Sequence, residues 1–312
     1  MPKLPNEEFR QLVVLLKEDE NFYPHEEPRQ IFWSEYTLSQ IKDAKETLQF
    51  IQDAVDKCAY LRLKGKVGKP LTDPKQLAKA ILICEALGFP ERIAEGWLEL
   101  LGPFVGITEY LDDRTIGDAY NKLEVVFILR QVFEQAKSSD GKLSGDGTGL
   151  ERSRKQNYES SKEYGEYMTS IVDSREVVQA FDVSGEQECK AMHALLEEVK
   201  GDSLRLDAGF NDRELARKIA EKEMIPYIFP KKNNNLNGSE AWKSMYLFLF
   251  LDVMAWLVEY HQRSHCESFH SSFKRKNKVL MKIRPLARLC QVMARIILHN
   301  RRKLAYFSRL KG

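Results

Sequence analysis

Four side chains that carry chemistry recur at helical spacing, directly after a strongly apolar segment. They are Tyr260, Arg263, Glu267 and Lys274. On one helix they would fall within an arc of roughly 60° and along a stripe about 21 Å long. A helix normally presents apolar core residues at these offsets. A packed face of this composition needs a metal ion for the carboxylate and carboxylates or phosphates for the two cations.

A solvated helix face with incidental ion pairs is the ordinary alternative for this segment. Glu267 and Lys274 are seven residues apart, whereas a local pair on a helix needs a spacing of three or four. The segment also follows the apolar residues 242–257, so it emerges from a stretch that is expected to be buried. These two observations favour a functional face.

The order Tyr, two residues, Arg, three residues, Glu, six residues, Lys resembles the Y–R–E–K signature of insertion-sequence DDE transposases. The match is complete in residue type and spacing. In that family the glutamate is the third catalytic carboxylate of an RNase H-like core. The resemblance therefore implies two aspartates upstream, each near the end of a strand.

Two aspartates fit this expectation. Asp146 stands in Leu143-Ser-Gly-Asp-Gly-Thr-Gly-Leu150, and Asp207 stands in Ser203-Leu-Arg-Leu-Asp-Ala-Gly-Phe-Asn-Asp212. Taken singly, the first is a turn signal and the second a turn or helix-entry aspartate. A phosphate-cradling loop would also need the Lys-Ser/Thr pair that residues 145–149 lack. The order of the three carboxylates and their intervals of 61 and 60 residues favour the transposase interpretation.

The resemblance implies a metal-dependent site formed by Asp146, Asp207 and Glu267. Carboxylates are the ligands that Mg²⁺ (or Mn²⁺) prefers. Three of them can hold two ions about 3.5–4 Å apart for an in-line displacement at phosphorus. Tyr260, Arg263 and Lys274 are expected to contact DNA beside the scissile phosphate.

Charge is unevenly distributed along the chain. From Lys274 to Gly312 there are 13 Lys and Arg residues and no Asp or Glu, so residues 1–273 carry a net charge of −11 although the whole chain is at +2. A basic block of this kind indicates a polyanionic partner. Its apolar residues also predict a packed helix, so we expect one face to dock on the protein and the other to meet phosphate.

Cysteine usage and hydropathy exclude two classes of protein. The five cysteines are scattered and form no Cys-x-x-Cys pair, so neither a disulfide framework nor a structural zinc site is expected. The apolar stretch around 242–258 is interrupted by Lys243 and Asp252 and is not expected to span a membrane. We expect a cytoplasmic protein, associated with the nucleoid of a prokaryote as the resemblance implies.

The N-terminal part predicts an arm over residues 1–36 and a helical domain over 37–139. A long helix is expected from Thr37, with a seam that suits either intramolecular packing or a dimer contact. Asp73-Pro74 predicts a helix start and Gly88 its end. Further helices are expected at Glu91 to Leu101 and about Asp113 to Phe133. The seam consists of Ile41, Ala44, Leu48, Ile51, Val55 and Cys58.

This helical domain is compatible with a helix-turn-helix DNA reader, although any three-helix bundle would fit. Its turn motifs are similar to those of the N-terminal region of insertion-sequence transposases, which extends the resemblance to about residues 65–305. The expected reading helix begins at Asp113. Its polar candidates for DNA contact are Arg114, Thr115, Asn121 and Lys122.

We expect residues 140–312 to form the catalytic domain. As the resemblance implies, it should be an RNase H-like α/β domain, with a mixed sheet, flanking helices and a basic C-terminal helix. Strands are expected near 142–147, 165–173, 175–183, before Asp207, and at 225–229. The first strand is less hydrophobic than a buried central strand should be. The interval from Asp207 to Glu267 is also too short for the inserted β domain that some relatives carry.

The leading hypothesis is a transposase that cleaves at the terminal inverted repeats of an insertion sequence and joins the 3′-hydroxyl ends to target DNA. Such an enzyme acts on double-stranded DNA, and a homodimer is expected in the synaptic complex. The alternative is a catalytically silent or domesticated relative that acts as a repressor. An RNase H-like nuclease without strand transfer would keep the carboxylates but would not need Tyr260, Arg263 and Lys274.

Overall fold

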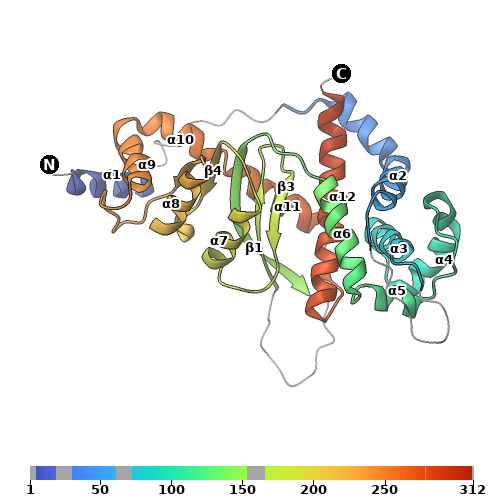
Figure 1. The fold of residues 1–312 in the computed structure, drawn as a ribbon. Helices are drawn as coiled ribbons and strands as arrows, with labels where there is room; N and C mark the ends of the chain where they lie inside the picture. The colour runs from blue at the N-terminus through green and yellow to red at the C-terminus, as the bar shows by residue number, and fades with distance from the viewer. Residues whose placement is uncertain (1–4, 19–29, 61–71, 153–165, 278, 311–312) are drawn as a thin grey trace. The chain divides into compact units, whose positions relative to one another are not determined.

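The computed structural model describes residues 1–312 apart from 1–4, 19–29, 61–71, 153–165, 278 and 311–312. Contacts divide the chain into two compact units, each assembled from segments that are far apart in sequence (Figure 1). The sheet unit comprises residues 1–30, 138–149 and 167–272, and the helical unit comprises 31–137, 150–166 and 273–312.

The sheet has the order β3-β2-β1-β4-β5. β2 and β3 are antiparallel, whereas β4 is parallel to both β1 and β5. The last residues of β1 pair with a short sixth strand, β6. This is the mixed sheet predicted from the sequence, so the α/β fold class is confirmed. The strands are β1 (Lys142–Arg152), β2 (Glu166–Val172), β3 (Val178–Asp182), β4 (Ser203–Leu206), β5 (Ile225–Ile228) and β6 (Val279–Leu280).

The weak hydrophobicity of β1 has a packing reason. A Cβ atom on Gly145 would come within 2.7 Å of Met192 and 2.8 Å of Leu206, so the missing side chain lets helix α7 (Glu188–Glu197) approach the strand closely. Ser144, the preceding residue, is buried and uses its hydroxyl in a hydrogen bond to Gln262. β1 is thus a central strand whose positions are specified by close approach and by polar contacts.

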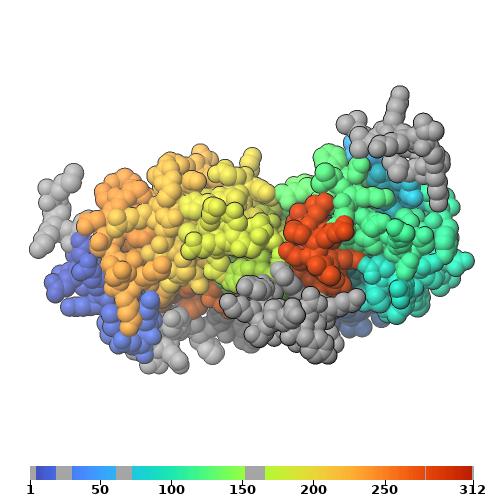
Figure 2. All heavy atoms as spheres, turned by 90° about the horizontal axis from the view of Figure 1, so that it is seen from below, coloured from blue at the N-terminus to red at the C-terminus, as the bar shows by residue number. Residues whose placement is uncertain are grey.

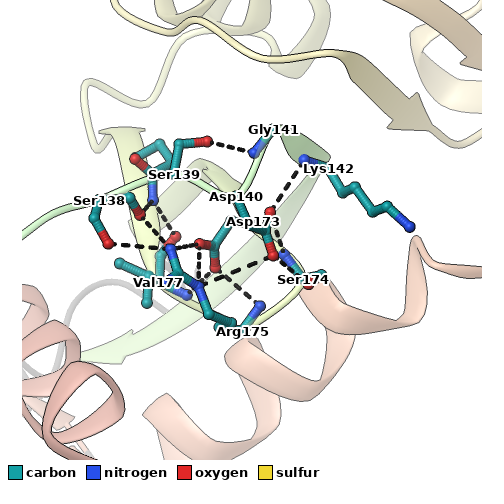
Figure 3. A network of polar contacts seen from close by, with 10 residues as sticks. Ser138, Ser139, Asp140, Gly141, Lys142, Asp173, Ser174, Arg175 and Val177 are labelled. Carbon is teal, nitrogen blue, oxygen red and sulfur yellow. Dashed lines mark hydrogen bonds and ion pairs between the residues drawn. The ribbon is translucent and has the colours of Figure 1, made fainter. Parts of the chain in front are cut away.

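A polar network at the β2–β3 turn holds the start of β1 (Figure 3). The fully buried Asp173 accepts hydrogen bonds from the backbone nitrogens of Arg175 and Val177, both at 2.9 Å. Its second oxygen pairs with the Arg175 guanidinium at 2.6 Å. That guanidinium also donates to the Ser138 carbonyl at 2.9 Å, in the segment that leads into β1. The Arg175 guanidinium therefore links the β2–β3 turn to the segment before β1, and this link determines where β1 begins.

The arm expected over residues 1–36 contains a helix, α1 (Asn6–Glu18), that packs into the core of the sheet unit. Phe9, Val13 and Leu16 are buried at helical spacing, and the Phe9 ring lies 5.2 Å from that of Tyr246. Figures 1 and 2 both place α1 beside α9 (Glu240–Leu251). Part of the segment expected to be an arm is therefore a packed helix, because a short apolar stripe suffices once a partner surface is present.

Helices α9 and α10 (Val253–His261) are core helices, with Trp242, Tyr246, Trp256 and Leu257 buried in the main apolar cluster. No single helix in the described residues is long and apolar enough to cross a membrane. Residues 240–251 and 253–276 meet that criterion only as a pair, and the pair is bent by 113°.

The helical unit confirms most of the expected helices. α3 begins at Pro74, with the Asp73 side chain accepting from the Lys75 nitrogen at 2.9 Å, and ends at Gly88 in the left-handed conformation. The long helix starts at Trp33 rather than at Thr37. The helices are α2 (Trp33–Asp56), α3 (Pro74–Leu87), α4 (Glu91–Leu101), α5 (Asp113–Ala119), α6 (Leu123–Gln135) and α12 (Pro285–Arg309), with a short 3₁₀ helix, η2 (Gly102–Val105).

The single helix expected from Asp113 to Phe133 is wrong, because the chain breaks between α5 and α6. The backbone nitrogens of Asn121 and Lys122 bond to carbonyls three residues earlier, which tightens the turn. Tyr120 is turned inward, and its hydroxyl donates to the Glu85 carboxylate at 2.8 Å. That contact, with a residue 35 positions away, was not visible in the local pattern.

The basic C-terminal segment pairs extensively with carboxylates of its own unit. Arg295 lies 2.7 Å from Glu85, with both side chains less than 10% exposed. Arg301 pairs with Asp43 and Glu46 on α2. At least six of the 13 cations therefore have internal partners, which accounts for much of the charge asymmetry. These six are Lys282, Arg288, Arg295, Arg301, Arg302 and Arg309.

We predict that Arg295→Ala lowers the free energy of unfolding of the protein by about 3–5 kcal/mol, because it leaves the Glu85 carboxylate buried without its countercharge. Urea unfolding followed by circular dichroism measures this change. Arg92→Ala is the matched control, since Arg92 is 90% exposed in its pair with Asp113 and its loss should change stability by less than about 0.5 kcal/mol. Equal effects of the two substitutions would contradict the prediction.

Candidate active site

Asp146, Asp207 and Glu267 come from three different elements. Asp146 lies in β1, and Asp207 directly follows β4. The two strands are parallel, with Ser144 opposite Arg205. Because side chains alternate along a strand, the two aspartates share a sheet face with Ser144 and Arg205. Glu267 lies in the first turn of α11 (Ser264–Lys276).

The three carboxylates lie near one another, because β1 pairs with β4 and Arg263 contacts both Asp146 and Glu267. Burial raises the pKa of Asp146 above its ordinary value, and the charges of Asp207 and Glu267 raise it further. The Gly147 backbone N–H and the Arg263 guanidinium oppose this rise but do not cancel it. The three carboxylates therefore form one acidic cluster.

Arg263 is the internal countercharge of this cluster. One of its terminal nitrogens lies 3.6 Å from Asp146, and the other donates to Glu267. Its side chain is 20% exposed, whereas that of Glu267 is 54% exposed. One guanidinium thus bridges two of the three carboxylates, so its expected phosphate contact stays a prediction.

A cleft of about 320 Å³ opens on this face and is lined by Asp207, Tyr260, Arg263, Ser264 and Glu267, among others. Tyr260 is mostly buried, with its ring stacked on Trp256 at 5.1 Å and tilted against Phe229 at 5.1 Å. The tyrosine therefore forms part of the apolar wall of the cleft. A phosphate contact by its hydroxyl stays a prediction.

The helix that carries the signature residues is not continuous. α10 ends at His261 and α11 begins at Ser264, with Gln262 and Arg263 in a turn between them. Backbone bonds there join residues three apart, such as Arg263 to Tyr260 at 2.9 Å and Cys266 to Arg263 at 3.0 Å. The assumption of one regular helix from Tyr260 to Lys274 was wrong.

The sheet supplies the reason for this break. The Ser144 hydroxyl donates to the Gln262 carbonyl at 3.0 Å, and the Arg205 Nε donates to the Glu259 carbonyl at 2.6 Å. Each donor stands two residues before one of the aspartates, on the same sheet face. Two backbone carbonyls at the end of α10 are therefore held by the strands that carry Asp146 and Asp207.

A fourth carboxylate, that of Glu188 at the start of α7, lies near the acidic cluster and was not predicted from the sequence. Burial raises the pKa of Glu188, and the charges of Asp146 and Asp207 raise it further. A Cβ atom on Gly147 would lie 2.5 Å from the Glu188 Oε1, so this glycine gives the carboxylate its space. Nothing in the local sequence distinguishes Glu188 from an ordinary acidic residue in a first helical turn.

The expected DNA-reading residues do not share one helix. Arg114 and Thr115 lie in the first turn of α5, and Arg114 is exposed. Asn121 and Lys122 lie in the turn between α5 and α6. That these four residues contact DNA stays a prediction.

The donor set of the acidic cluster suits a hard divalent metal ion. It offers carboxylate oxygens only, which Mg²⁺ and Mn²⁺ prefer. Burial, together with the charges of Asp207 and Glu267, raises the pKa of Asp146, and a bound cation would favour the ionised form of this carboxylate. Asp146, Asp207 and Glu267 therefore fit the metal site that the sequence predicted.

We predict that Asp146→Asn stabilises the metal-free protein at pH 7. Because the pKa of Asp146 is raised in the folded state, the wild type loses stability relative to the variant as pH rises through that pKa. The gain in Tm should therefore be largest at neutral pH and shrink on acidification. Thermal scans in EDTA between pH 4 and pH 7 test this, with Asp182→Asn as the control. A gain that is independent of pH would count against the charge effect.

The comparisons with known proteins bear on this site. The family model of the transposase DDE domain matches residues 131–300, which is more than half of the chain and a range that contains Asp146, Asp207 and Glu267. No curated protein matches the chain. Among solved structures, the chain is similar to the piggyBac transposase in a synaptic complex with hairpin DNA, at 10% identity and a TM-score of 0.41, over 86% of this chain and 72% of that one. By the family match, this chain belongs to the DDE transposases.

Proposed function

We propose that this transposase cleaves DNA at the terminal inverted repeats of an insertion sequence and joins the free 3′-hydroxyl ends to target DNA. The observation that carries the proposal is the acidic cluster of Asp146, Asp207 and Glu267, with Arg263 as countercharge and with Asp207 and Glu267 lining an open cleft. DDE transposases generally use divalent metal ions. Neither serine nor cysteine is needed as a covalent nucleophile in this chemistry.

Asp146, Asp207 and Glu267 would hold Mg²⁺ or Mn²⁺, and we propose two ions. Metal ions in such a site make the attacking water or 3′-hydroxyl more acidic and stabilise the leaving oxygen. The protein fixes the carboxylates in place: Asp146 and Asp207 through parallel strands, and Glu267 through the bonds from Ser144 and Arg205 to the preceding helix.

Arg263 serves two states of the site in this proposal. Without substrate it forms ion pairs with Asp146 and Glu267. With DNA bound, its guanidinium is well suited to the phosphate beside the scissile bond, because its planar array of donors matches phosphate oxygens. Tyr260 orders the adjacent backbone from the apolar wall of the cleft, and Lys274 binds a phosphate further from the cut.

We further propose that the helical unit recognises the element ends, with Arg114, Thr115, Asn121 and Lys122 as candidates. Two copies of the chain would assemble with two ends in a synaptic complex in the cytoplasm. Only the first half of the α2 seam is exposed enough to form a contact between two copies of the chain. Ile41 is 74% exposed there, whereas Ile51 and Val55 are fully buried within the unit.

We predict that Asp146→Asn, Asp207→Asn and Glu267→Gln each abolish nicking and joining of supercoiled DNA that carries candidate element ends, with Mg²⁺ or Mn²⁺ present. DNA binding should survive, since it rests on Lys and Arg. Gel detection of nicked and joined products provides the measurement, and Asp182→Asn should keep activity. Specific binding without cleavage by the wild type would instead fit the repressor alternative.

We predict that Lys274→Ala weakens end binding and lowers the slope of log K against log salt by roughly 0.9, the contribution of one phosphate contact on duplex DNA. Fluorescence anisotropy at several salt concentrations gives the slope. Lys243→Ala is the control, because Lys243 pairs with Glu240 on α9. If Lys274→Ala keeps the wild-type slope, the phosphate contact is refuted.

A further inference from the structure

A second group of metal-ligating side chains lies in the sheet unit and has no part in the proposed function. Cys189 and His193 stand four residues apart on α7, so they present their side chains on one helix face. Asp212 is the N-cap of α8 (Arg213–Glu221). One ligand atom from each lies within 4.8 Å of the others.

Helix capping explains only one oxygen of Asp212. Its Oδ1 accepts the backbone N–H of Glu214 at 2.8 Å, as an N-cap requires. Its Oδ2 lies 2.9 Å from His193 Nε2 and 3.8 Å from Cys189 Sγ. Two donors from another helix thus converge on the oxygen that the cap does not use.

Two of the three separations between these ligand atoms are close to those of a tetrahedral zinc site. Zinc bond lengths of ~2.0–2.3 Å imply separations of about 3.4 Å between nitrogen and oxygen ligands and about 3.6 Å between sulfur and oxygen ligands. The observed 2.9 Å and 3.8 Å differ from these values by amounts that small side-chain rotations can absorb.

The group is also accessible. Cys189 lines an open cavity of about 400 Å³, together with Glu188, Gly209 and Tyr167. His193 and Asp212 have side chains 21% and 35% exposed. An ion can therefore enter, and a water molecule can complete the fourth position.

We propose that Cys189, His193 and Asp212 bind Zn²⁺ or a chemically similar borderline divalent cation. A thiolate and an imidazole select such an ion over Mg²⁺, which favours oxygen ligands. The bound ion would join α7 to the start of α8, five residues after Asp207, and so brace the turn that follows the catalytic aspartate. The site stands on its own residues and does not depend on the proposed DNA chemistry.

Co²⁺ is the probe for this site, because a cobalt–thiolate bond gives a charge-transfer absorption that carboxylate ligands alone do not. Titration of the metal-free full chain with CoCl₂ should produce this band and bring it to a plateau. Zn²⁺ should abolish the band by displacement, whereas excess Mg²⁺ should leave it. Cys189→Ser should eliminate the band, and His193→Ala should weaken Co²⁺ binding by at least the ~10–100-fold typical of losing an outer-shell partner.

Two controls separate this site from the rest of the molecule. Cys58→Ser removes a buried thiol of the helical unit and should keep the band. Asp146→Asn should also keep it, although it abolishes catalysis, so the failure of one proposal is distinguishable from failure of the other. Circular dichroism verifies that each variant is folded. Absence of the band in the wild type, or its persistence in Cys189→Ser, would show that His193 and Asp212 form only an ion pair.

Discussion

The acidic cluster depends on one buried cation, Arg205. Its guanidinium is fully inaccessible, yet its donors reach three elements: the Leu143 carbonyl of β1, the Ser203 hydroxyl of β4, and both the carbonyl and the carboxylate of Glu259 on α10. A buried charge is tolerable only when its partners are all in place. The arginine therefore fixes the spacing between the two central strands and the helix that leads to Glu267.

Ser144 repeats the same device on the neighbouring strand. Its hydroxyl bonds to the Gln262 carbonyl, three residues after the carbonyl that Arg205 binds. The parallel strands β1 and β4 thus both bond to the end of α10. Asp146 and Asp207 each follow the bonding residue of their own strand by two positions. The positions of the three carboxylates therefore depend mainly on how β1 pairs with β4 and on the bonds from these strands to the end of α10.

The strands and several helix ends could be predicted from the sequence because they follow local rules, whereas the three carboxylates were singled out by the resemblance to the transposase signature. Alternating Leu204 and Leu206 before an aspartate specify a strand end, and Asp73 and Gly88 specify helix ends. The breaks at Tyr120 and at Gln262 could not be predicted in this way. Each depends on a hydrogen bond to a residue distant in sequence, Glu85 in one case and Ser144 in the other.

The charge pattern did not show how much of the positive charge is matched internally. The basic C-terminal segment indicated a polyanionic partner and a packed helix, but it did not indicate which cations pair with carboxylates of the protein. In the structure, Arg295, Arg301 and Arg309 meet Glu85, Asp43 and Glu46, so much of the segment's charge is matched inside the helical unit. Composition reports the amount of charge, and only the fold shows how much of it is left for a partner. Likewise, Cys189 and His193 gain Asp212 from a separate helix, which no cysteine spacing reveals.

Gly145 and Gly147 flank Asp146, and both leave room that a neighbouring side chain occupies: Met192 beside the first, Tyr167 and Glu188 beside the second. This has a consequence for how copies of a mobile element decay. A copy with a larger residue at either position would retain all three carboxylates. The added side chain would nevertheless push α7 or β2 away from the site. Surveys that judge a copy intact by its three carboxylates alone would count it as active, so the two glycines belong in that criterion.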